Sequence, residues 1–233
     1  MTEQDSGGVP VPFRFMDCSL LTVSTGIRAQ SLRELRAAVS TIPTSSIYYH
    51  FWGRMLRPHI AESEYNNDFA TWADSGLGDV ELAEELSSVN AADCKDMEEV
   101  REILEDILDA HLDRDDFMSW KKSDRDFFFI DCTKLMFDTG REVSSLDDFP
   151  KEVKTSSLQS FFHHYIDGRR RSEEGKDDFT LWLEQFGDET KKLRSALQSV
   201  DSYLFSLGEL KSQVVAILER FARSRRRDDD RHA

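Results

Sequence analysis

Two stretches of this chain repeat one another, and the repeat constrains the fold more than any other feature. Residues 13–18 (FRFMDC) reappear as residues 127–132 (FFFIDC), at an offset of 131 − 17 = 114. The same offset aligns residues 46–51 with residues 160–165. Beyond a small gap, an offset of 178 − 68 = 110 aligns Asp68, Phe69 and Trp72 with Asp178, Phe179 and Trp182. Because cysteine, histidine and tryptophan recur in one order, the pattern predicts an internal duplication.

The repeat divides the chain into five segments. We expect a first repeat unit at residues 13–112 and a second at residues 127–223, joined by a charged linker at residues 113–126. The polar N-terminus, residues 1–12, and the Arg/Asp-rich end, residues 224–233, are predicted to be disordered.

Each copy opens with an apolar run rich in aromatic residues, which predicts a strand. A Thr-Gly pair follows each run and is typical of a turn. Capping patterns such as Ser31 with Glu34 then predict about five helices in each copy. The fold class is therefore α+β and predominantly helical, with two tandem strand-plus-helices units related by a pseudo-two-fold axis. Pairing the two strands across that axis would satisfy their edges, and two separate helical units are the alternative.

Apolar spacing also predicts the core of the first copy, and the second copy should bury the aligned residues. The predicted core comprises Phe15, Leu35, Ile47, Phe51, Phe69, Trp72, Leu82, Leu86, Ile103 and Ile107.

Composition excludes several classes of protein. The formal net charge of −15 disfavours nucleic acid as a partner, because phosphate contacts need clustered basic side chains. No apolar stretch approaches the length of about 20 residues that a membrane span needs, and the N-terminus lacks the pattern of a signal peptide. An odd count of 3 cysteines favours reduced thiols and a cytoplasmic location.

The same motifs resemble a known family. Thr25-Gly26, Ser31-Leu-Arg-Glu-Leu, Ser-Ile-Tyr-Tyr-His50, Asn-Asp-Phe-Ala-x-Trp72 and Leu82-Ala-Glu-x-Leu together resemble an uncharacterised prokaryotic family, the domain of unknown function five-seven-five-two. The likeness covers nearly the whole chain and implies no activity. Family members lie near sugar-nucleotide or trehalose-type glycosyltransferases, which implies a role in carbohydrate metabolism. Members are often richer in histidine after the Tyr-His pair, where this chain has Phe51 and Trp52, and the difference weakens a metal role carried over from the family.

The first candidate ligand-binding set comprises Tyr49 and His50 with His163 and His164 from the second copy. If the copies bring these residues to one cleft, Asp68 and Asp178 could complete a set of metal or catalytic groups. The alternative, which we favour, is a pair of buried histidines that pack among aromatic rings and bond to backbone carbonyls. No His-x-x-x-His spacing is present, so no metal site is predicted.

The second candidate set comprises Trp72 and Trp182, whose rings could stack on a sugar. We favour a structural interpretation, in which both rings lie in the core and Asp68 and Asp178 accept backbone N–H bonds at helix starts.

Arginines after the histidine segments form the third set, a candidate phosphate site. It comprises Arg54, Arg57, Arg169, Arg170 and Arg171. Ion pairs with neighbouring acidic residues are the favoured alternative. The aligned cysteines, Cys18 and Cys132, each follow an aspartate, which raises a thiol pKa and favours an inert core position.

We therefore expect a non-enzymatic accessory or regulatory module, because the sequence carries no nucleophile–base or metal signature and no cofactor motif. Its partner would be another protein, with a glycosyltransferase as the candidate, and the chain would be a monomer or a homodimer. The acidic outer face of the final helices would serve as a contact surface; it comprises Glu98, Glu99, Glu102, Glu105, Asp106 and Asp109. Whether the protein is an enzyme stays open. The alternative is an enzyme or sugar-phosphate-binding protein that uses a cleft near His50 and His164.

Overall fold

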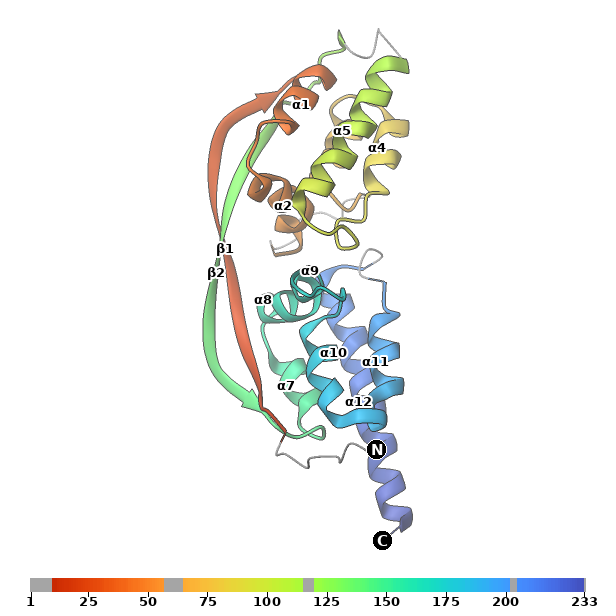
Figure 1. Ribbon diagram of the computed structural model, residues 1–233. Helices are drawn as coiled ribbons and strands as arrows, with labels where there is room; N and C mark the ends of the chain where they lie inside the picture. The colour runs from red at the N-terminus through yellow and green to blue at the C-terminus, as the bar shows by residue number, and fades with distance from the viewer. Residues whose placement is uncertain (1–9, 57–64, 115–119, 202–204, 233) are drawn as a thin grey trace, which may run out of the picture. The chain divides into compact units, whose positions relative to one another are not determined.

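The structure, a computed structural model, describes residues 10–56, 65–114, 120–201 and 205–232 (Figure 1). Two long strands pair with each other and short helices follow each of them. The first strand and its helices are β1 (Phe13–Ala29), α1 (Leu32–Val39), α2 (Thr44–Trp52), the 3-10 turn η1 (Gly53–Leu56), α3 (Asp68–Ser75), α4 (Val80–Ser87) and α5 (Met97–Arg114).

The second strand leads into a similar series. It comprises β2 (Phe127–Val143), α7 (Phe149–Thr155), α8 (Leu158–Phe161), a π-helical turn η2 (Phe162–Ile166), α9 (Asp167–Arg171), α10 (Asp178–Leu183), the 3-10 segment η3 (Glu184–Thr190), α11 (Lys191–Gln198) and α12 (Leu207–His232). The fold is α+β and predominantly helical, as the sequence predicts. No helix within the described ranges is long and apolar enough to cross a lipid bilayer.

The two strands form an antiparallel two-stranded sheet, which confirms the predicted pairing. The hydroxyl of Thr25 donates to the Phe129 carbonyl at 2.8 Å, and the hydroxyl of Thr139 donates to the Phe15 carbonyl at 2.5 Å. Antiparallel order therefore brings the end of each strand to the start of the other.

This pairing decides which strand segments cover which helices. The chain forms two compact units: a first unit of residues 19–135, and a second unit that joins residues 136–233 to the segment ending at Cys18. Each unit thus takes the start of one strand and the end of the other. In Figure 1, α1 and α2 lie beside the strands in the first unit, and α7 and α8 lie beside them in the second.

The compact units consequently differ from the predicted repeat boundaries 13–112 and 127–223. Phe127, not Phe13, packs on α3, where its ring stacks on Phe69 at 5.1 Å between centroids. Phe13 packs in the second unit, 5.4 Å from the ring of Phe179. The physical reason is the length of the strands. Each strand has 17 residues and extends beyond the helices of one unit, so its two ends are buried against the helices of different units.

Capping bonds explain where several helices begin. Ser31 accepts the Glu34 N–H at 3.3 Å while Glu34 accepts the N–H of Gln30. At the start of α12, Ser206 accepts the Glu209 N–H at 3.3 Å and Glu209 accepts the N–H of Ser206 itself at 2.9 Å. These reciprocal bonds satisfy N–H groups that a helix leaves open at its first turn. Both capping boxes were expected from the sequence.

Most of the predicted core is buried: Phe15, Leu35, Ile47, Phe51, Phe69, Trp72, Leu82 and Leu86. Ile103 and Ile107 of α5 are only half-buried, and this part of the prediction was wrong. The buried face of α5 instead carries Val100, Leu104, Leu108 and His111. Both isoleucines lie one position away from that stripe, at its edge.

The Thr-Gly pairs do not end the strands, which corrects a second expectation. β1 continues through Thr25 and Gly26 to Ala29. Gly26 has a φ of 74°, in the left-handed region that favours glycine, and the Thr25 hydroxyl also accepts the Ile27 N–H at 3.0 Å. The pair therefore makes a local irregularity inside a long strand, as Gly140 does in β2, where φ is 68°.

Both predicted disordered ends contain ordered structure. Val11 bonds to Gln185 through its N–H and to Trp182 through its carbonyl; residues 1–9 lie outside the described residues. At the other end α12 continues through the predicted disordered segment to His232. The segment contains no Gly or Pro, arginine is a good helix former, and Arg225 reaches Asp147 at 3.4 Å.

The predicted charged linker, residues 113–126, is also partly structured. α5 extends to Arg114, and residues 115–119 lie outside the described residues. Asp126, at the end of the linker, pairs with Arg28 at 2.8 Å within the first unit. The carbonyl of Arg125 accepts the indole N–H of Trp72.

Candidate functional site

His50 connects a helix of the first unit to the edge of a strand. The residue is 3% exposed and lies on α2. Nδ1 lies 2.9 Å from Oδ2 of Asp68, at the start of α3, and Nε2 accepts the backbone N–H of Ile130 in β2 at 3.1 Å. One imidazole therefore joins three elements.

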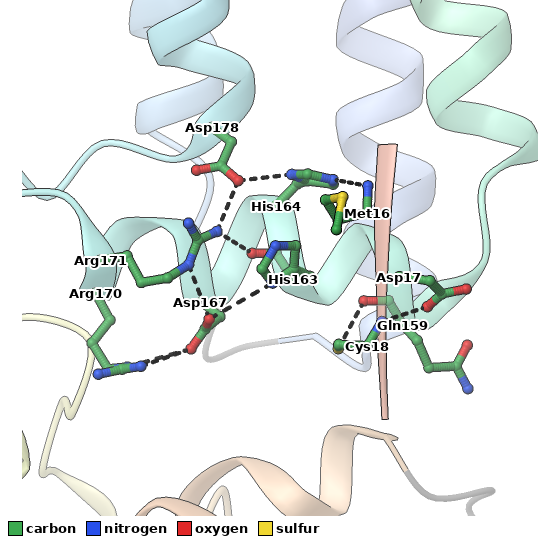
Figure 2. Close-up of polar contacts among 10 residues, drawn as sticks. All are labelled: Met16, Asp17, Cys18, Gln159, His163, His164, Asp167, Arg170, Arg171 and Asp178. Carbon is green, nitrogen blue, oxygen red and sulfur yellow. Dashed lines mark hydrogen bonds and ion pairs between the residues drawn. The ribbon is translucent and has the colours of Figure 1, made fainter. Parts of the chain in front are cut away.

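His164 makes the same contacts in the second unit, as Figure 2 shows. The residue is 3% exposed, Nδ1 lies 2.7 Å from Oδ2 of Asp178, and Nε2 accepts the backbone N–H of Met16 in β1 at 2.8 Å. The His164 side chain, on η2, therefore joins the first residue of α10 to strand β1.

These contacts define the tautomer of both rings. A backbone N–H can only donate, so Nε2 of each ring must be the acceptor and carries no hydrogen. Nδ1 then carries the hydrogen and donates it to the carboxylate. The predicted bond to a backbone carbonyl was wrong: the acceptor is a carboxylate, and the backbone is the donor. Both nitrogens of each ring are engaged within the unit.

Asp68 and Asp178 can bond to histidine because neighbouring residues cap the helices. Asn67 accepts the Ala70 N–H at 2.8 Å at the start of α3, and Asp177 accepts the Thr180 N–H at 2.9 Å at the start of α10. We expected Asp68 and Asp178 to be the caps, and the structure moves that role one residue earlier. Because the capping side chain accepts the first-turn N–H, the carboxylate of the next residue is left to bond to the imidazole.

Arginines complete the polar cluster around each carboxylate. Arg171 donates to Oδ2 of Asp178 at 2.8 Å, while the guanidinium of Arg54 lies 3.7 Å from Oδ1 of Asp68. Burial alone would raise the pKa of Asp178, but hydrogen bonds from His164 and Arg171 outweigh it and hold that pKa below its usual value.

The two units differ beside this cluster. In the first unit the ring of Tyr49 lies so close to Gly53 that a Cβ there would be 2.7 Å from it. The aligned pair in the second unit is His163 and Asp167, with 3.9 Å between Nδ1 and Oδ2. Asp167 is fully buried and also pairs with Arg170 and Arg171. The second unit thus has an ionic network where the first unit has an aromatic contact.

One group of side chains has the composition of a metal site. His163, His164 and Asp178 each offer a ligand atom within 4.8 Å of the others. However, Arg171 already donates to the carboxylate oxygen that His164 uses, and Nδ1 of His164 carries the hydrogen of that contact. A metal ion would have to displace the guanidinium and that hydrogen. The donor set therefore fits an internal ion pair better than a metal ion.

The tryptophans offer no open face to a sugar. Trp72 and Trp182 are both buried, and their indole N–H groups donate to the carbonyls of Arg125 at 2.6 Å and Val11 at 2.7 Å. Each ring therefore packs in the core of its unit.

The remaining arginines have protein partners. Arg54 donates to Thr71 at 2.9 Å, Arg169 to the Tyr165 hydroxyl at 2.9 Å, and Arg170 to Asp167. Arg57 lies outside the described residues. Ion pairs and internal hydrogen bonds, the favoured alternative for this set, account for the described arginines.

The Asp-Cys pairs have a structural use that the sequence did not indicate. Asp17 and Asp131 each accept the N–H of the following cysteine at 2.8 Å, and each also accepts a serine hydroxyl, from Ser157 and Ser45 respectively. Burial, together with the charge of Asp131, raises the pKa of Cys132 to about 11, so this thiol is protonated at neutral pH, as expected.

Sequence reasoning missed one further buried pair. His111 near the end of α5 lies 2.8 Å, through Nε2, from Oδ2 of Asp79, whose other oxygen caps α4 at the Leu82 N–H. The pair fixes α4 to α5. The available signal was the histidine on the apolar face of α5.

Comparisons with known proteins agree with the described fold. The family model described as "Family of unknown function (DUF5752)" matches residues 10–219. A search of curated proteins found no match. Among solved structures, the chain is similar to OrfY from Thermoproteus tenax, with 28% sequence identity and a TM-score of 0.76, over 91% of this chain and 96% of that one. The matched region includes both strands and both His–Asp pairs, and the chain therefore belongs to the DUF5752 family of unknown function.

Proposed function

We propose that the protein is a non-enzymatic accessory or regulatory module that acts in the cytoplasm by binding another protein. The observation that carries this proposal is that both ring nitrogens of His50 and of His164 are hydrogen-bonded within the protein. Each ring, the strongest candidate for a catalytic base, has its Nδ1 on a carboxylate and its Nε2 on a strand N–H. A base with both nitrogens engaged has no lone pair for a substrate.

An exposed acidic surface supports a protein partner. The outer side of α5 carries Glu98, Glu99, Glu102, Asp106 and Asp109, all of them exposed, whereas Glu105, also expected on this face, is half-buried and pairs with Arg36. Arg101 pairs with Glu98 and Arg36 with Asp109, whereas Glu102 and Asp106 make no ion pair within the described residues. This acidic face, defined by those five residues, would attract a basic surface. A glycosyltransferase is the candidate partner that the family resemblance suggests, which would link the protein to carbohydrate metabolism.

We also propose that the chain is an internal duplication with a pseudo-two-fold axis. The support is chemical: aligned histidines, aligned aspartates and aligned strand N–H groups form the same set of bonds in both units. Two helical units of separate origin would not be expected to share the same contact of a carboxylate, an imidazole and a strand N–H.

Affinity capture can test the partner. Immobilised protein should retain a protein from an extract of the source organism. A Glu102→Gln/Asp106→Asn variant should lose it, because two charges of the acidic face are removed. Glu173→Gln/Asp188→Asn is the matched control, since it removes two exposed charges elsewhere. Equal retention by both variants would contradict a role for the acidic face.

The alternative is an enzyme or sugar-phosphate-binding protein, and the His163, His164 and Asp178 cluster is the observation that favours it. A thermal-shift panel of divalent metals and sugar phosphates separates the two. A rise in Tm of several degrees that His164→Gln abolishes would support the alternative, because a ligand that binds the folded state stabilises it. No response across the panel, together with a retained partner, would support the module.

A further inference from the structure

We propose that residues 20–24 of β1 form a docking edge for the same segment of a second molecule, so that two chains associate through antiparallel pairing of their β1 strands. The sheet has only two strands among the described residues, so each has one edge without a neighbouring strand. Free strand edges carry N–H and C=O groups that can pair with another chain.

Side chains block this edge on both sides of the segment. The outward N–H of Met16 is bound by His164, that of Cys18 by Asp17, and that of Gly26 by the Ser24 hydroxyl. Alternate residues of a strand direct their N–H groups to the same edge. The N–H groups of Leu20, Thr22 and Ser24 therefore face the open side, and none of them has a side-chain acceptor among the described residues.

The aligned segment of β2 carries charges that β1 lacks. At the offset of 114, Leu20 corresponds to Lys134 and Ser24 to Asp138. Charged side chains are a common device that keeps strand edges from pairing. From Cys18 to Ile27 the chain contains no charged residue, although charged residues make up 32% of the protein. If the two strands arose by duplication, as we propose, only the β1 edge lacks charged side chains that would oppose pairing with another strand.

The side chains of the segment are exposed and match one another. Leu21 is 57% exposed and Val23 is 61% exposed, while Thr22 and Ser24 are also exposed. Antiparallel pairing centred on Thr22 places Leu21 of one molecule opposite Val23 of the other, twice per pair. Such apolar cross-strand neighbours stabilise a sheet.

The uncharged, self-complementary sequence of the segment favours a second molecule of this chain as the occupant. The segment offers no charge that would select an acidic or basic peptide, and its sequence complements itself. Two chains of formal net charge −15 repel each other, so contact should form where neither carries charge. Because five residues make a short interface, we expect weak, concentration-dependent dimerisation.

Sedimentation equilibrium of the full chain over a range of concentrations tests the proposal. The wild type should shift from monomer to dimer, and Leu20→Lys/Ser24→Asp should remain monomeric. This variant gives β1 the residues of β2, and an aspartate at 24 can still accept the Gly26 N–H because Asp138 accepts the Gly140 N–H at 2.8 Å. Circular dichroism and an unchanged Tm would show that it folds.

A backbone variant provides an independent check. Thr22→Pro removes one outward N–H, whereas Met136→Pro removes the aligned N–H of β2 and serves as the matched control. We expect the first to abolish dimerisation and the second to leave it intact. A wild type that stays monomeric at every concentration would overturn the proposal. So would a dimer that survives both Leu20→Lys/Ser24→Asp and Thr22→Pro.

Discussion

Nε2 of His164 accepts the backbone N–H of Met16 at 2.8 Å, although the two residues are 148 positions apart. His50 does the same for Ile130 in the first unit. Each histidine covers an edge N–H of a strand and fixes it to a helix, while its other nitrogen holds the start of a second helix through a carboxylate. The histidines are therefore structural connectors, and replacing them should lower the free energy of unfolding.

His164→Phe should lower the free energy of unfolding by about 2–4 kcal/mol. The change leaves the Met16 N–H without its acceptor and the half-buried Asp178 carboxylate without one donor, and unsatisfied polar groups away from water are costly. Urea denaturation followed by circular dichroism measures the loss. His164→Gln keeps an acceptor near the Nε2 position and should recover part of it. A His164→Phe variant as stable as the wild type would contradict the connector role.

NMR should find the same tautomer at His50 and His164. Because Nε2 accepts from a backbone N–H, its ¹⁵N shift should be that of an unprotonated ring nitrogen, and Nδ1 should show a bonded hydrogen. Long-range ¹H–¹⁵N correlation spectra distinguish the two nitrogens. Hydrogen at Nε2 in either ring would contradict the described contacts.

Asp178 should make stability depend on pH in the acidic range. Its pKa is lower in the folded chain than in the unfolded chain, so the charged carboxylate favours folding. This contribution is fully present above the unfolded value of about 3.9 and is lost as the pH falls through the folded value. Unfolding free energies of the wild type and Asp178→Asn, measured from neutral to acidic pH, should therefore converge as the pH falls. A constant difference would contradict this account.

Asp177→Asn should stabilise the protein at neutral pH. Burial raises the pKa of Asp177 despite its bonds to Thr180, so the charged form is disfavoured in the folded chain. Asn67 caps α3 with an amide oxygen at the aligned position, which shows that asparagine suits the role. Asp177→Ala is the contrasting variant, and it should cost about 1 kcal/mol because the cap is lost. An equal decrease in Tm for Asp177→Asn and Asp177→Ala would show that the carboxylate charge itself is required.

Alkylation should distinguish the cysteines. Cys18 and Cys132 are buried, and the pKa of Cys132 is raised to about 11, whereas Cys94 is half-buried with a pKa raised mainly by burial. Iodoacetamide at pH 8 followed by peptide mass spectrometry should label Cys94 first, since the thiolate and its exposure control the rate. Faster labelling of Cys132 would indicate that the strand opens.

Local signals in the sequence predicted the elements that depend on near neighbours. Ser31 with Glu34 and Ser206 with Glu209 indicated helix starts, and the aromatic runs indicated both strands, because capping and strand preference act over a few residues. The positions of Phe69, Trp72 and Leu86 in the core followed from their apolar spacing. The same local reasoning failed at Thr25-Gly26, since a turn and a strand irregularity use the same residue types.

The partners of the candidate site residues depended on tertiary structure. Spacing alone did not show that Asn67 and Asp177 take the capping role, which leaves Asp68 and Asp178 to bond to histidine. Nor did it show that the acceptor of each histidine hydrogen is a carboxylate or that the donor to Nε2 is a strand amide.

The sequence by itself determined the type of most elements, and it favoured the pairing of the two strands over two separate helical units. Only the tertiary structure decided that Phe127 packs on α3 and that Phe13 packs in the second unit. Antiparallel pairing carries the two ends of each long strand to different helices, and this consequence of strand length and direction is not encoded in any local pattern.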